Sequence, residues 1–203
     1  MDWAKANVEL TERKKKILEI LAQRRLLTID QLEYFHPGFG HQAKSKAILR
    51  EDINKLFAVY FVDKALKKPV IQWDGSVKKT EVVALGEIGS QYIGWKKHHK
   101  RIKYRDGQVI LPSTAHHTIR IHDMEIQTRE LLKEMNVEVK AWVYECGGKV
   151  VKHKNGLNPD VFCMLLDHET GKHYSFFAEY DTGKDDYAHR KYFPNLTKKI
   201  ERY

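Results

Sequence analysis

Three acidic residues border a predicted hairpin near the end of this 203-residue chain: Asp160 begins an apolar strand, and Glu179 and Asp181 end the next one. Alternate side chains of a strand point to one face, so Glu179 and Asp181 are predicted neighbours, and antiparallel pairing brings Asp160 beside them. Carboxylates this close repel one another unless a cation or a basic side chain lies among them. The pattern predicts a Mg²⁺ or Mn²⁺ site of the kind that binds a phosphate and generates hydroxide, and the alternative is three solvated acids.

The excess positive charge of the chain lies in its first half. Residues 1–105 hold 22 Lys and Arg against 12 Asp and Glu, whereas residues 106–203 hold 14 against 15. A basic half attracts a polyanion such as double-stranded DNA through its phosphates and the release of their counterions. The first half is therefore predicted to bind DNA, although solvated lysine faces are also common on proteins that do not.

The first half has the pattern of a winged helix-turn-helix. Apolar residues at helical spacing predict helices over 11–25, 29–35 and 42–57, and Thr11 and Thr28 are placed to cap the first two. The elements expected after them are strands over 59–62, 70–73 and 79–85 and a closing helix over 84–93. In such a unit the third helix enters the major groove and the hairpin contacts the flanking backbone.

Nine residues of the first half are predicted to contact DNA, because they are polar or basic and lie on the third helix or near the strand connections. They are Lys44, Ser45, Lys46, Arg50, Asn54, Lys67, Lys68, Lys78 and Lys79. The alternative is that the same three-helix unit binds another protein.

The second half predicts a small α/β layer. A long helix is expected over 117–135, and three strands of a mostly antiparallel meander follow it over 137–145, 161–166 and 174–181. A last helical segment is predicted over 185–203, interrupted at Pro194. The chain is thus predicted to be α+β, with a winged helix over 1–95, a basic linker over 96–116 and a second domain over 117–203.

Other features limit the class of protein. No apolar run is long enough to span a bilayer and no signal-like segment opens the chain, so a cytoplasmic location is predicted. Cys146 and Cys163 lack metal-binding spacing and are expected to be buried thiols. The histidines repeat no known ligand spacing, so no zinc site is predicted.

The hairpin acids resemble a known nuclease signature. Pro159-Asp160 followed by Glu179 is similar to the PD-(D/E)xK motif of the restriction-endonuclease-like fold, in which the Asp and Glu bind metal and a Lys activates water. Asp181 stands where that Lys is expected. The resemblance therefore implies a small restriction-endonuclease-like α/β domain that is degenerate as a nuclease.

The whole chain resembles the replication-relaxation family of plasmids and phages. The motifs that carry this resemblance are Leu85-Gly86, His122-Asp123, Asn158-Pro159-Asp160, Phe176 to Gly183, and Lys199 to Tyr203. It implies a bacterial, DNA-associated protein that acts in plasmid replication, DNA relaxation or transfer. Implied partners are double-stranded DNA, replication or transfer proteins, and a second copy of the chain, but not a membrane.

Two other functions stay open at this point. One is a Mg²⁺-dependent DNA nickase or endonuclease, in which Asp160 and Glu179 bind the metal, Asp181 is a third ligand, and Lys199 or Lys191 replaces the missing lysine. The other is a winged-helix transcriptional regulator whose second domain mediates dimerisation.

Overall fold

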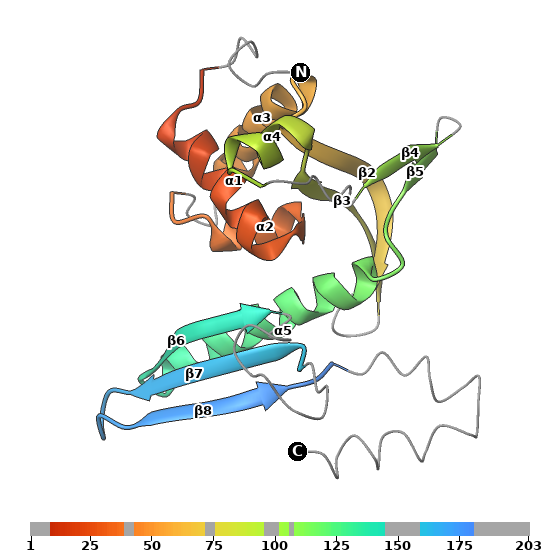
Figure 1. Ribbon diagram of the computed structural model, residues 1–203. Helices are drawn as coiled ribbons and strands as arrows, with labels where there is room; N and C mark the ends of the chain where they lie inside the picture. The colour runs from red at the N-terminus through yellow and green to blue at the C-terminus, as the bar shows by residue number, and fades with distance from the viewer. Residues whose placement is uncertain are drawn as a thin grey trace, which may run out of the picture. The chain divides into compact units, whose positions relative to one another are not determined.

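A computed structural model gives the structure of the chain and describes residues 9–38, 43–71, 76–95, 102–105, 108–144 and 159–180. The fold is mixed α+β with small, open sheets, which confirms the predicted class (Figure 1). The chain divides into two compact units, Met1–Asp123 and Met124–Tyr203. This division falls within a helix, whereas the sequence predicted a second domain that starts at residue 117.

The first unit is built from short helices around one small sheet. Its leading elements are α1 (Glu12–Arg24), β1 (Leu26–Thr28), α2 (Ile29–Phe35), α3 (Ala43–Ala58), β2 (Val62–Ile71), β3 (Val77–Leu85) and α4 (Glu87–Tyr92). The three strands pair antiparallel in the order β1-β3-β2, so β3 is central and β2 lies at an edge. All three predicted helices are present.

Two threonines begin the first two helices, as predicted. The side chain of Thr11 accepts a hydrogen bond from the Lys14 amide, and Thr28 forms a capping box with Gln31. Each cap satisfies backbone N–H groups that have no partner inside the helix.

The side chain of Gln31 also connects α2 to the helix α5 (Ala115–Glu134). Its Oε1 accepts from the Thr28 amide at 2.9 Å, and its Nε2 donates to the Ile119 carbonyl at 2.8 Å and to Asp123 Oδ1 at 2.7 Å. The amide therefore uses its oxygen and its nitrogen at the same time.

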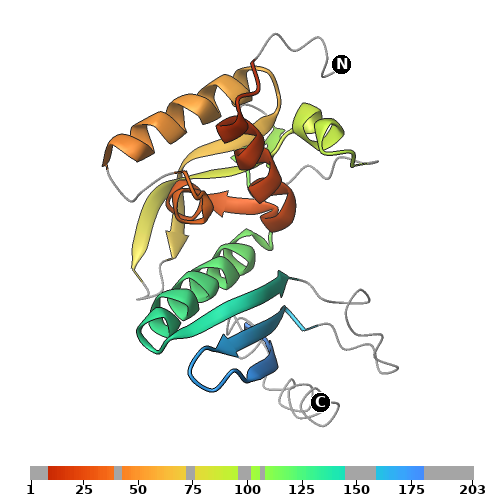
Figure 2. The same cartoon turned by 90° about the vertical axis from the view of Figure 1, so that its left-hand side faces the viewer.

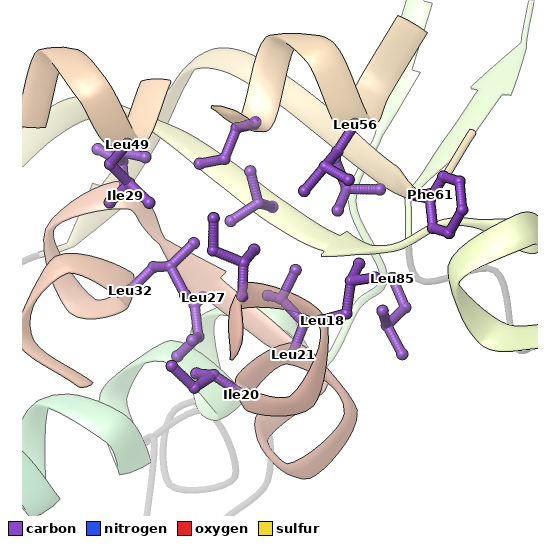
Figure 3. Close-up of a cluster of buried hydrophobic side chains, with 14 of the residues drawn as sticks. Leu18, Ile20, Leu21, Leu27, Ile29, Leu32, Leu49, Leu56, Phe61 and Leu85 are labelled. Carbon is purple, nitrogen blue, oxygen red and sulfur yellow. The ribbon is translucent and has the colours of Figure 1, made fainter. Parts of the chain in front are cut away.

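The main core of the first unit lies between these helices and the sheet. Figure 3 shows the side chains of α1, α2 and α3 directed toward one another, with residues of β1 and β3 among them. On α3 the predicted apolar stripe is confirmed, because Leu49, Ile53 and Leu56 are fully buried. Each such side chain contributes roughly 1.5–3 kcal/mol by leaving water.

Two glycines let α4 approach the turn after α3. The Gly86 amide donates to the Phe61 carbonyl at 2.9 Å, and the Ile88 amide donates to the Tyr60 carbonyl at 3.0 Å. A Cβ atom added at Gly86 would collide with the Tyr60 carbonyl oxygen, and one at Gly89 would collide with that of Phe61. The Leu-Gly motif at residues 85–86 thus has a packing reason.

The strands differ from the prediction in two places. The sequence predicted two strands joined by a turn that carries Lys67 and Lys68, but β2 runs without interruption from Val62 to Ile71. A register shift between Ala65 and Lys68 accommodates the segment against β3. Pro69 is compatible with β2 because an edge strand needs only one of its sides for pairing. The three-residue strand β1 was not predicted.

The predicted basic linker contains structure of its own. Strands β4 (Lys103–Arg105) and β5 (Gln108–Ile110) form an antiparallel hairpin, and Ile102 before them is buried. Ile102 packs in a second apolar cluster that includes Val82 of β3 and Ile119 of α5. The burial of Ile102 was not predicted, because basic and aromatic residues surround it in the sequence.

The second unit holds a three-stranded antiparallel sheet beside the later turns of α5. Strands β6 (Val137–Tyr144), β7 (Val161–Asp167) and β8 (His173–Ala178) pair in that order, which confirms the predicted meander. Figures 1 and 2 both show α5 running along this sheet. The predicted last helix, over 185–203, lies outside the described residues. No helix in the described part of the chain is long and apolar enough to cross a membrane.

Cys163 of β7 is a buried free thiol, as predicted, and Cys146 lies outside the described residues. Burial raises the pKa of the Cys163 thiol to about 11. A thiol in that state is a poor nucleophile at neutral pH, so Cys163 is a core residue.

Candidate functional site

One face of α3 presents a row of polar side chains beside the sheet of the first unit. Lys46, Arg50 and Asn54 are spaced four residues apart, so they lie on the same side of the helix. Ser45 is half-buried, and the side chain of Lys44 lies outside the described residues.

Acidic residues of neighbouring elements contact this row. Lys46 Nζ lies 2.5 Å from Asp30 Oδ1 and 3.4 Å from Glu33 Oε2, both on α2. Arg50 Nε lies 3.4 Å from Glu81 Oε2 on β3. The Asn54 side-chain oxygen accepts a hydrogen bond from Lys64 of β2. Lys46, Arg50 and Asn54 are thus already engaged within the chain.

Asp30 joins α3 to the strand β3. Its second carboxylate oxygen lies 2.8 Å from Lys78 Nζ, so one carboxylate receives Lys46 and Lys78 together. Burial acts to raise the pKa of Asp30, but the hydrogen bonds from the two lysines outweigh it and the pKa lies below its usual value. The carboxylate is therefore charged at neutral pH.

A groove of about 340 Å³ lies between α3 and the β2–β3 hairpin. Its lining includes four of the predicted contact residues, which are Lys46, Arg50, Lys78 and Lys79. Asp30 and Glu81 line the same groove. It is a mixed surface of cations and carboxylates.

Lys67 and Lys68 are the two predicted contact residues on the edge strand β2, and Lys68 does not line this groove. Lys68 donates to the Val109 carbonyl of β5 at 2.5 Å, so it fastens the β4–β5 hairpin. The side chain of Lys67 lies outside the described residues. The structure therefore gathers four of the nine predicted contact residues in one groove and directs Lys68 to another partner.

The second unit brings two of the predicted hairpin acids to one end of its sheet. Val161 pairs with Ala178, so Asp160 and Glu179, which immediately precede and follow that pair, lie at the same end. Asp160 Oδ2 accepts a hydrogen bond from the Tyr180 amide at 2.8 Å. Asp181, Lys191 and Lys199 lie outside the described residues, and no group of three or more His, Cys, Asp or Glu side chains suited to a metal occurs within them.

Glu125, an acid that was not predicted as a site residue, lies near the end of the sheet that carries Asp160. Glu125 of α5 is fully buried, accepts a hydrogen bond from the Tyr144 hydroxyl, and lies 2.8 Å from Arg129 Nε. Tyr144 pairs with Val161, beside Asp160. Only the four-residue spacing of Glu125 and Arg129 could have suggested this pair.

Neither the curated proteins nor the solved structures that were compared with the chain gave a match. The family comparison did, and it confirms the family that the sequence resembles. Residues 18–203 match the family model described as replication-relaxation, and the chain belongs to the replication-relaxation family.

Proposed function

We propose that the chain binds double-stranded DNA through its first unit, which acts as a winged helix within plasmid replication or relaxation. Family membership supports the replication or relaxation role. The order α1, β1, α2, α3, β2, β3 supports the winged helix, because it places a third helix beside an antiparallel hairpin.

The observation that carries the proposal is the groove between α3 and β3. It collects Lys46, Arg50, Lys78 and Lys79 on the helix and the strand that a winged helix directs at DNA. Phosphates compete with the carboxylates of Asp30 and Glu81 for these cations, and each phosphate that is bound releases counterions. Affinity is therefore expected to fall steeply as the salt concentration rises.

The double variant Lys46→Ala, Arg50→Ala is expected to bind duplex DNA about tenfold or more weakly at moderate salt, because two cations leave the α3 face. The slope of log affinity against log salt should fall by less than about two, because neighbouring carboxylates already compensate part of these two charges. Fluorescence anisotropy with a labelled duplex across a salt series measures both quantities.

The matched control is Lys15→Ala, Lys55→Ala. It removes the same charge from two exposed lysines that pair with Glu12 and Glu51 at 2.6 Å. An equal loss of affinity in both double variants would show that net charge, and not the groove, binds DNA.

Metal-dependent cleavage is the second candidate, because Asp160 and Glu179 lie at one end of the β7–β8 pair. Two carboxylates fit the oxygen preference of Mg²⁺ and would be its ligands. Two features weigh against cleavage: Asp181 stands where the resemblance expects a lysine, and the Asp160 carboxylate accepts the Tyr180 amide. We propose that the second unit does not cut DNA.

Supercoiled plasmid incubated with the protein and Mg²⁺ or Mn²⁺ is expected to yield no open-circle product. Glu179→Gln serves as the matched control for contaminating nuclease. Nicking by the unmodified chain that disappears in Glu179→Gln would establish the cleavage function.

Footprinting distinguishes the remaining roles, since protection at a replication or transfer origin fits the proposal and protection over a promoter fits a regulator.

A further inference from the structure

Two of the three cations that the groove acids hold are more exposed than those acids. The Glu81 side chain is 11% exposed and its partner Arg50 is 50% exposed, and Asp30 is 36% exposed where Lys78 is 55% exposed. Lys46 is 32% exposed, about as much as Asp30. Arg50 and Lys78 therefore reach further into solvent than the carboxylates that hold them. Such an arrangement restricts the conformations of a long basic side chain and compensates part of its charge.

We propose that Asp30 and Glu81 are the specificity-determining residues of this interface: they position Lys46, Lys78 and Arg50 and limit their attraction to DNA of any sequence. This inference rests on the proposed function. It assigns a role to two acids on a surface whose expected ligand is itself an anion.

The physical reason is a difference between two kinds of contact. Phosphate contacts are the same along every duplex, and a mobile, uncompensated lysine makes them readily. Base contacts require a guanidinium or ammonium group at a fixed place and angle. The Arg50–Glu81 and Lys46–Asp30–Lys78 contacts weaken the phosphate contacts and favour the base contacts, because they fix the donor groups before DNA arrives.

The low pKa of Asp30 supports this role, because its carboxylate holds both lysines at any pH at which the protein would meet DNA. Asp30 also spans two elements, as Lys46 belongs to α3 and Lys78 to β3. One carboxylate thus sets the distance between the ammonium groups of the helix and the strand.

The test neutralises each acid without changing its shape, in Asp30→Asn and Glu81→Gln. Affinity for a random-sequence duplex is expected to rise about threefold to tenfold at low salt. The salt slope should steepen by less than about one for Glu81→Gln and by more for Asp30→Asn, which removes the carboxylate from Lys78 and leaves Lys46 with Glu33. The preference for a duplex selected from a random pool by the unmodified chain, over random sequence, should fall at least threefold.

Glu51→Gln is the matched control, since Glu51 lies on α3 and pairs with Lys55 at 2.6 Å outside the groove lining. Equal changes in Glu51→Gln, or unchanged slopes and preference in the groove variants, would overturn the inference. Failure of the unmodified chain to bind any duplex would instead overturn the proposed function. Circular dichroism checks folding, and Glu81→Gln alone decides the question if Asp30→Asn fails to fold.

Discussion

Gly89→Ala is expected to lower the free energy of unfolding of the first unit by about 3 kcal/mol or more. In most helices the same change stabilises by about 1 kcal/mol, because alanine is the better helix former. Here the added methyl group would meet the Phe61 carbonyl oxygen, which is backbone and already accepts the Gly86 amide. Either α4 moves away from the turn or the turn distorts. Urea unfolding followed by circular dichroism measures the loss.

Gly38→Ala is the control for this prediction. A Cβ atom at Gly38 would lie 3.2 Å from Cε1 of the His36 ring, which is a wider approach, and to a side chain instead of a backbone carbonyl. Its effect on unfolding is expected to stay within about 1 kcal/mol. If the two alanine variants unfold at the same urea concentration, the prediction that the close approach of α4 to Phe61 makes Gly89→Ala destabilising is wrong.

Arg129→Met is expected to destabilise the second unit by about 3 kcal/mol, because it removes the guanidinium that compensates the fully buried Glu125 carboxylate. Methionine keeps much of the volume and the flexibility of the arginine stem, so the loss reports mainly on charge. Amide hydrogen exchange in β6 and β7 localises the effect, and urea unfolding gives its size.

Two further variants complete this test. Lys133→Met removes the same charge one turn later, from an exposed pair with Glu130 at 2.5 Å, and should change stability by less than about 1 kcal/mol. Adding Glu125→Gln to Arg129→Met should restore part of the loss, since an amide can still accept from Tyr144 without a buried charge. No recovery in this double variant would mean that Arg129 acts through packing instead.

The features that could be predicted from the sequence are local. Thr28 caps α2 because its partner Gln31 is three residues away, and Leu49, Ile53 and Leu56 show their stripe within one helix. The continuity of β2 could not be predicted, because a strand tolerates Lys67 and Lys68 only once β3 pairs with it. The order of β6, β7 and β8 followed from alternation and turn residues.

The chemistry of the candidate site was harder to predict because its partners are distant in sequence. Arg50 and Glu81 are 31 positions apart, and Lys78 and Asp30 are 48 apart. The lysines were recognisable as a basic excess, but nothing in the sequence indicates which carboxylates hold them. The prediction therefore included the basic residues that line the groove and overestimated how much of their charge is uncompensated.

The side-chain amide of Gln31 couples α2, near the start of the first unit in sequence, to the part of α5 that ends this unit. Among the natural side chains, only asparagine and glutamine supply an acceptor oxygen and two N–H donors within one amide group. Asparagine is shorter than glutamine by one methylene group. Glutamate in its place would face Asp123 with a second negative charge. Because Asp30 is the preceding residue, we expect a sequence change in α5 that displaces Ile119 or Asp123 to shift the carboxylate that contacts Lys46 and Lys78. Residues of α5 outside the groove lining can therefore alter the arrangement of its cations.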